Sequence, residues 1–124
     1  MLSKSKIQRF EDLIIWQKSL KVSKKVFILS DSGPLSREYS LKDQLRRSSL
    51  SIISNIAEGF GRYGKKDFRH FLSIANGSAN ELRAQLHLTK ELGFVSAKEA
   101  DELIELCAAI SRMIKGLRNS VNKT

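Results

Sequence analysis

Few side chains in this sequence have the types and spacing that catalysis or metal binding requires. His70 and His87 do not form the His-x-x-x-His or Glu-x-x-His pairs that build metal sites in helical bundles. Cys107 falls on an apolar helical stripe, where a cysteine usually serves as a small buried hydrophobe. The serines at 48, 49, 51 and 54 have no candidate base beside them. The sequence therefore predicts a protein that is not an enzyme and binds no metal or cofactor.

A glycine-rich stretch, residues 59–64, formally contains the pattern G-x-G-x-x-G. That pattern binds dinucleotides only between a strand and a helix of a βαβ unit, and here it follows a predicted helix. We expect these glycines to end the helix and turn the chain. Arg62, Lys65 and Lys66 accompany Tyr63 there, so the loop is a candidate phosphate site at the start of the next helix.

Positive charge is the strongest signal in the composition. The chain has 22 Lys and Arg against 13 Asp and Glu, a net charge of +9, and a pI near 9.9. Most of the excess falls within residues 1–65. Lys18, Lys21, Lys24 and Lys25 share one side of the first predicted helix, with no acid among them. Such clusters are typical of nucleic-acid binding, although an ordinary solvated helix face is the alternative.

The elements that position these residues are helices. Apolar residues recur with helical period over residues 11–29, 40–58, 67–92 and 97–119, and alternating strand patterns are missing. Ser40 with Asp43, and Ser96 with Glu99, form candidate capping boxes. Short connections predict one all-α domain over residues 1–124, an antiparallel up-down-up-down four-helix bundle. One cysteine, no secretory signal and no apolar run of about 20 residues predict a cytoplasmic protein without a membrane span.

The second helix has an apolar arc about 180° wide, whereas a surface helix needs little more than about 100°. We therefore expect it to pack against a neighbouring subunit as well as its own bundle. Arg46 projects into this arc and needs a buried or intersubunit carboxylate, for which Glu81 is the candidate. Gly77, inside the third helix, indicates that another backbone packs close to it. The opposite stripe is either a solvated face or a contact surface and contains Gln44, Arg47, Ser51, Asn55, Glu58 and Arg62.

Three segments of the second helix carry a family resemblance: Gln44-Leu45-Arg46-Arg47, Ser51-Ile52 and Asn55-Ile56-Ala57-Glu58-Gly59. They resemble the signature of the four-helix bundle family found in intervening sequences of bacterial 23S rRNA genes, the so-called S23 ribosomal protein family. The motifs Phe10-x-x-Leu13-x-x-Trp16 and Phe68-x-x-Phe71-Leu72 through Glu81-Leu82 extend the resemblance. The chain departs from it at Ile53, where many members have proline.

The resemblance implies a homopentameric bundle without established enzymatic activity, and RNA or DNA binding is suspected for the family. It also implies a more distant similarity to the accessory variability protein of diversity-generating retroelements. Positions expected to serve the oligomer or the family motif are Gln44, Arg46, Arg47, Ser51, Ile53, Asn55, Glu58, Gly59, Gly77 and Glu81.

Two functions follow from the sequence. The first is a non-enzymatic oligomeric bundle that binds structured RNA or DNA through phosphate contacts. Its expected contact residues are Lys18, Lys21, Lys24, Lys25, Arg62, Lys65 and Lys66. The alternative is a scaffold for an unidentified protein partner, with no role in nucleic-acid binding.

Overall fold

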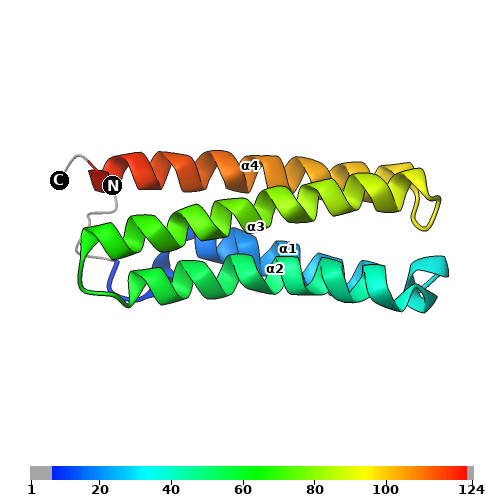
Figure 1. Ribbon diagram of the computed structural model, residues 1–124, viewed down its shortest axis with the longest axis horizontal. Helices are drawn as coiled ribbons and strands as arrows, with labels where there is room; N and C mark the ends of the chain where they lie inside the picture. The colour runs from blue at the N-terminus through cyan, green and yellow to red at the C-terminus, as the bar shows by residue number, and fades with distance from the viewer. Residues whose placement is uncertain (1–6, 123–124) are drawn as a thin grey trace.

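The computed structural model describes residues 7–122 of the 124-residue chain. Four long helices make up the fold: α1 (Ile14–Leu29), α2 (Tyr39–Phe60), α3 (Lys65–Glu91) and α4 (Ala97–Asn122) (Figure 1). Two short 3-10 helices, η2 (Phe10–Asp12) and η3 (Pro34–Arg37), precede α1 and α2. The described residues contain no strand, and the predicted all-α fold is confirmed.

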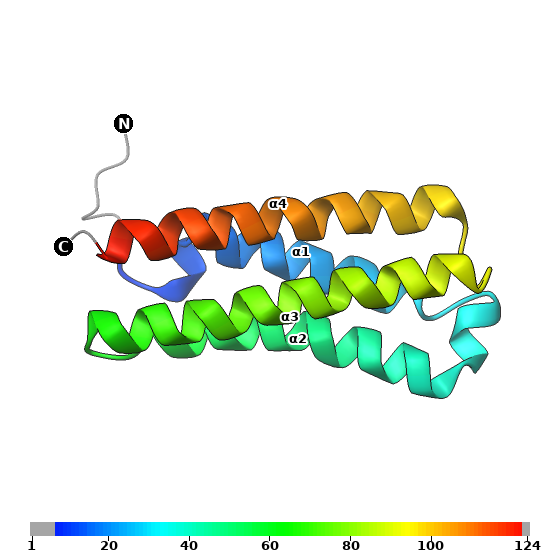
Figure 2. The same cartoon turned by 45° about the horizontal axis from the view of Figure 1, so that its top comes forward.

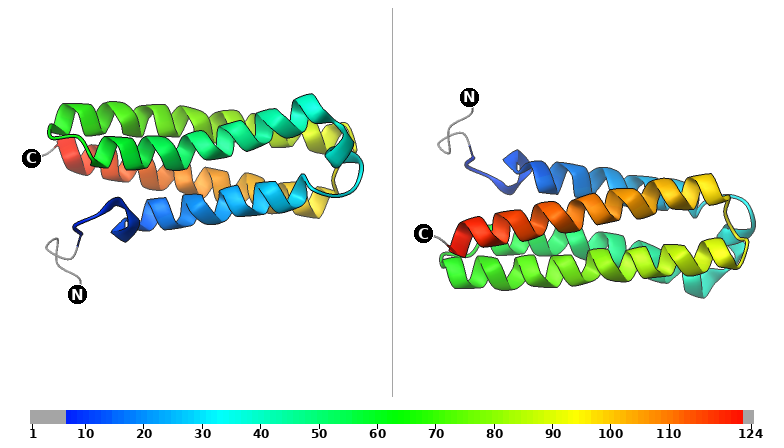
Figure 3. Two further views of the ribbon diagram at one scale, coloured as in Figure 1. Left: turned by 90° about the horizontal axis from the view of Figure 1, so that it is seen from below. Right: turned by 90° about the horizontal axis from the view of Figure 1, so that it is seen from above.

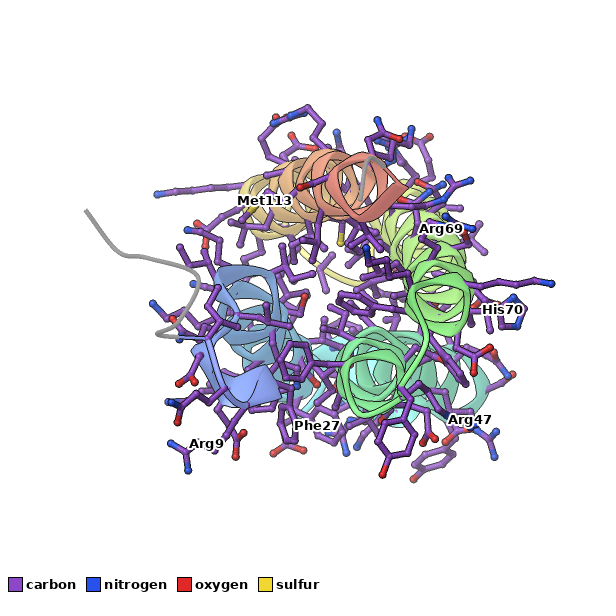
Figure 4. The ribbon with its side chains drawn as sticks, turned by 90° about the vertical axis from the view of Figure 1, so that its left-hand side faces the viewer. Arg9, Phe27, Arg47, Arg69, His70 and Met113 are labelled. Carbon is purple, nitrogen blue, oxygen red and sulfur yellow. The ribbon has the colours of Figure 1, made fainter. Side chains whose placement is uncertain are left out.

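Consecutive helices run in opposite directions, which makes the fold the predicted antiparallel bundle (Figures 1 and 2). Seen end-on, the helices form a square in which each contacts the next and α4 closes against α1 (Figure 4). The helices α1 and α3 are therefore diagonal. The loop between α2 and α3, the start of α1 and the end of α4 share one end of the bundle (Figure 3). We call this the α2–α3 end, and the opposite one the far end.

The core lies between the four helices, and each helix contributes one apolar stripe at helical spacing. Its largest fully buried side chains are Val22, Val26, Leu35, Leu45, Ile52, Ile56, Leu72, Leu82, Leu86, Ile110 and Ile114. Small hydroxyl side chains separate these stripes and let helices approach closely, as where Ser23 and Ser49 share a hydrogen bond of 3.1 Å. Within the described residues, every buried side-chain nitrogen or oxygen has a hydrogen-bond partner.

The first helix is shorter than the sequence predicts, because the chain is extended at Leu13 between η2 and α1. The Asp12 carboxylate accepts the backbone N–H groups of Gln8 and Arg9, at 3.0 and 3.1 Å, which closes η2 as a separate turn. These two hydrogen bonds hold the pKa of Asp12 below its usual value. Leu13 is buried, so the break inserts an apolar side chain into the core.

Of the two expected capping boxes, only the second forms. Ser96 Oγ accepts the Glu99 N–H at 3.1 Å, and a Glu99 carboxylate oxygen accepts the Ser96 N–H at 3.3 Å. At the start of α2, the expected box between Ser40 and Asp43 is absent. Instead, Asp43 accepts a hydrogen bond from Arg47 at 3.1 Å.

Gly59 does not end α2, contrary to the sequence expectation. The helix continues to Phe60, and Gly59 is buried within its last turn. A Cβ atom placed on Gly59 would lie 2.6 Å from the Cβ of Phe71 in α3, much closer than real Cβ contacts. The glycine is therefore needed for the close approach of α2 and α3. The chain turns at Gly61–Gly64, so the turn begins two residues later than expected.

Candidate nucleic-acid interface

The four lysines of α1 are all exposed, as the sequence predicts. Lys25, however, forms an ion pair with Glu102 of α4, with 3.2 Å between Nζ and Oε1. No acid lies among the four lysines on α1 itself, and the carboxylate beside Lys25 comes from a neighbouring helix. Lys18, Lys21 and Lys24 form no ion pair with any residue in the range 7–122.

The basic residues of the α2–α3 loop are exposed but differ in their contacts. Arg62 donates to Glu58 at 3.0 Å, and its guanidinium lies over the Phe71 ring, 5.0 Å from the ring centre. Lys65 and Lys66 are the first two residues of α3 and have no ion pair within the described range. The helix dipole makes a helix N-terminus favourable for anions and unfavourable for lysines. An anion bound there would interact favourably with both the dipole and the two lysines, so this placement supports anion binding at the α2–α3 end.

The structure separates the predicted contact residues into two groups, because α1 and α3 are diagonal (Figure 4). The helix α4 lies between α1 and α3 (Figure 3). Its C-terminal half carries Arg112, Lys115 and Arg118, all exposed, at the same end of the bundle. These three residues, and Arg69 of α3, are not among the contact residues predicted from the sequence. The predicted antiparallel order could have indicated them, because it brings the end of α4 beside the start of α3.

Positive charge is concentrated at the α2–α3 end. If the bundle is divided at the middle of each helix, the half that contains this end comprises residues 7–21, 50–78 and 110–122. It has ten bases and four acids: Arg9, Lys18, Lys21, Arg62, Lys65, Lys66, Arg69, Arg112, Lys115 and Arg118, with Glu11, Asp12, Glu58 and Asp67. The other half, residues 22–49 and 79–109, has nine of each. The whole excess of six charges in the described range therefore lies in one half, a grouping that position along the sequence does not reveal.

An open pocket of about 310 Å³ lies between the start of α3 and the end of α4. Its lining consists of Lys66, Arg69, His70, Ser73 and Arg118. Figure 4 shows Arg69 and His70 next to each other on α3, with Arg69 nearer to α4. The pocket therefore belongs to the basic half of the bundle.

The expected carboxylate partner of Arg46 is present, but it is Asp31 and not Glu81. The Arg46 guanidinium donates to Asp31 Oδ1 at 3.0 Å and to Ser30 Oγ at 2.8 Å. It also lies 4.5 Å from the centre of the Phe27 ring and donates to the Phe27 carbonyl at 3.4 Å. Arg46 thus joins α2 to the end of α1. Glu81 is exposed on α3 and forms no ion pair with another described residue.

The remaining residues of the family motif divide between the surface and the contact of α2 with α3. Gln44, Arg47 and Glu58 are exposed. Ser51 shares a hydrogen bond of 2.7 Å with Ser78 of α3, and Asn55 donates to Ser51 Oγ at 3.0 Å. The stripe that the sequence predicts as one polar face of α2 therefore lies partly in the contact between α2 and α3.

Gly77 is exposed, and a Cβ atom built on it would meet nothing within 4 Å. The closely packed backbone that the sequence predicts at this position is therefore not supplied by residues 7–122.

Cys107 and the two histidines have different environments in the bundle. Cys107 is buried, and burial raises the pKa of its thiol to about 12. His70 and His87 are exposed. No three His, Cys, Asp or Glu side chains among the described residues are grouped so that they could hold a metal ion. Nor does this part of the chain contain a helix with the length and apolar character needed to cross a membrane.

The model of the family described as 23S rRNA-intervening sequence protein matches residues 11–116. The chain belongs to this family. A crystal structure of a protein with unknown function from the S23 ribosomal protein family of Bacteroides thetaiotaomicron is similar, with a TM-score of 0.76 and 20% identity. The match covers 85% of this chain and 98% of that one, and at this identity it shows a shared fold. A comparison with curated proteins found no match.

Proposed function

We propose that this 23S rRNA-intervening sequence protein is a non-enzymatic, oligomeric bundle that binds structured RNA or DNA through phosphate contacts. The observation that carries the proposal is the concentration of ten bases and only four acids in the half that contains the α2–α3 end. A dense group of Lys and Arg attracts a polyanion and releases its counterions, a contribution that does not depend on base sequence.

The proposed contact surface differs from the seven residues expected from sequence. Lys18, Arg62, Lys65 and Lys66 remain in it, joined by Arg69, Arg112, Lys115 and Arg118, and Lys21 lies at its margin. Lys24 and Lys25 belong to the far half, and the ion pair of Lys25 with Glu102 competes with a phosphate for its charge. We therefore give these two lysines a smaller role.

Fluorescence anisotropy of a structured RNA and a matched DNA duplex, titrated with the protein at low and moderate salt, tests the proposal. We expect binding with a steep salt slope, and weaker binding of every sequence alike by the double variant Lys65→Glu/Lys66→Glu. Each lost phosphate contact should reduce the slope of log K against log salt by about 0.9 on duplex DNA.

The matched control is Arg37→Glu/Lys98→Glu, which makes the same change in net charge at exposed positions of the far half. We expect it to weaken binding much less. Equal weakening by both pairs would show that net charge alone matters and would contradict an interface at the α2–α3 end. No binding even at low salt would contradict the proposed function and favour the alternative, a scaffold for a protein partner.

Self-association is part of the proposal, and the flank of α2 beside α1 supports it. Arg46 marks this flank through its contacts with Phe27 of α1 and with Ser30, which directly follows α1. Leu50, Ile53 and Ala57 follow Arg46 at intervals of three and four residues, so they share this flank. Leu50 is 43% exposed, and Ile53 and Ala57 are only half-buried, so the described chain covers the wide apolar arc incompletely. The assembly we propose is the homopentamer that the family resemblance implies.

A further inference from the structure

The pocket between α3 and α4 at the α2–α3 end is lined by basic and neutral polar side chains, without an acidic one. Of the five side chains around its 310 Å³, three are formally cationic, one is histidine, one is serine and none is acidic. Lys66, Arg69, His70 and Ser73 follow one another on α3 at intervals of three, one and three residues, which places them along one helical stripe. Arg118 completes the pocket from α4.

The register of the two helices places Arg69 and Arg118 at the same level along the bundle. Ser111 of α4 donates a hydrogen bond to Asn76 of α3, which fixes one matched pair. Arg69 precedes Asn76 by seven residues, and Arg118 follows Ser111 by seven. Because the helices are antiparallel, seven residues backward along α3 and seven residues forward along α4 lead in the same direction, about two helical turns toward the α2–α3 end. Both arginines line the pocket, one from each helix.

These charges have no partner of opposite sign among the described residues. Each of Arg46, Arg47 and Arg62 forms an ion pair with a carboxylate, but Lys66, Arg69 and Arg118 form none within residues 7–122. The Ser73 hydroxyl donates to the Arg69 carbonyl, a contact within α3 that leaves the charges unchanged. Like charges held close together repel one another, and a bound anion would remove this repulsion.

We infer that Lys66, Arg69, His70, Ser73 and Arg118 form a binding site for one phosphate group. Guanidinium groups bind phosphate oxygens in pairs of parallel hydrogen bonds, and a lysine adds a point charge. A phosphate of a nucleic-acid strand and a free phosphorylated compound present the same chemistry. Assigning the phosphate to a strand rests on the proposed function, whereas binding of the phosphate group as such does not.

Thermal unfolding with inorganic phosphate, compared with sodium chloride at the same ionic strength, tests the site. At a concentration about ten times its dissociation constant, phosphate should raise the melting temperature by roughly 3–6 °C. Arg118→Gln should abolish this rise and, without phosphate, melt at the same or a higher temperature because it removes repulsion. Lys98→Gln is the matched control: it removes the same charge from an exposed position of α4 in the far half, outside the pocket and the proposed contact surface. It should keep the full response.

An equal response of the two variants, or no rise above that in chloride, would overturn the site. A second measurement compares binding of one oligonucleotide with and without a 5′-phosphate. Loss of affinity on removing the phosphate, seen in the wild type but not in Arg118→Gln, assigns the site to a strand end. Stabilisation by inorganic phosphate without nucleic-acid binding supports the site for a free phosphorylated compound and overturns the proposed function. Nucleic-acid binding without any response to phosphate overturns the site alone.

Discussion

Two glycines of the family pattern have opposite environments. Gly59 is buried in α2 where α3 crosses closely, and an added methyl group would meet the Cβ of Phe71 at 2.6 Å. That atom is fixed to the backbone of α3, so it cannot move aside as the end of a long side chain can. Gly77 is exposed in α3 with nothing within 4 Å of the added atom. The same substitution should therefore have opposite effects at the two positions.

We expect Gly59→Ala to lower the free energy of unfolding by about 1–3 kcal/mol, because overpacking outweighs the better helix propensity of alanine. Gly77→Ala should raise it by roughly 0.5–1 kcal/mol, because only propensity changes. Denaturation in urea measures both values. A stabilised Gly59→Ala variant would contradict the close approach of α2 to Phe71. Destabilisation by Gly77→Ala would show that its surface is covered in the assembled protein.

At the scale of elements, the connection between α1 and α2 depends on Arg46. Its guanidinium reaches three groups at the end of α1: the Phe27 carbonyl, the Ser30 hydroxyl and the Asp31 carboxylate. Its side chain is 24% exposed, whereas that of the adjacent Arg47 is 72% exposed in an ordinary pair with Asp43. The two arginines are neighbours in sequence but belong to a helix junction and to a solvated surface, respectively.

Replacing each arginine by glutamine separates these roles. We expect Arg46→Gln to lower the free energy of unfolding by about 1–3 kcal/mol, because the buried Ser30 and the Phe27 carbonyl at the end of α1 lose a charged partner. Arg47→Gln, the matched control, should change it by less than about 0.5 kcal/mol, as is usual for exposed pairs. Both values come from chemical denaturation monitored by circular dichroism. Equal losses in the two variants would argue against a junction role for Arg46.

The sequence predicted the four helices and their buried stripes because both depend on local spacing. Ser96 and Glu99, three residues apart, formed their capping box for the same reason. What the sequence did not predict depends on residues distant along the chain. Glu81 was the candidate partner of Arg46 in a buried or intersubunit pair, whereas the observed partner is Asp31, directly after α1. Likewise, Arg118 and Lys66 are far apart in the sequence, and only the packing of α4 against α3 brings them to one pocket.

At the scale of the whole molecule, the exposed flank of α2 predicts self-association. Ile53 is among the positions expected from the sequence to serve the oligomer, but it is half-buried in the described chain, so replacing it by aspartate would also disturb the fold. Leu50 shares the flank and is 43% exposed, so it is the better probe. The control is Leu88 of α3, which is 51% exposed on a different helix.

We expect Leu50→Asp to reduce the solution mass measured by light scattering, because a charge in an apolar interface must be desolvated. Leu88→Asp should leave the mass unchanged. Circular dichroism should report full helix content for both variants, since neither side chain is buried in the bundle. A Leu50→Asp protein that keeps the mass of the wild type would place the interface elsewhere.

The uneven charge of the bundle also determines how it turns in an electric field. At 1.5 Å per residue, the 27 residues of α3 give a rod about 40 Å long, and all of the excess charge of residues 7–122 lies in one half of it. At physiological salt, electrostatic forces fade over about 8 Å, roughly a fifth of that length. A rod near a polyanion therefore experiences a torque that points the α2–α3 end toward it, while the far end remains outside the reach of the field. The molecule should arrive end-first, with its far end directed into solution and accessible to other molecules.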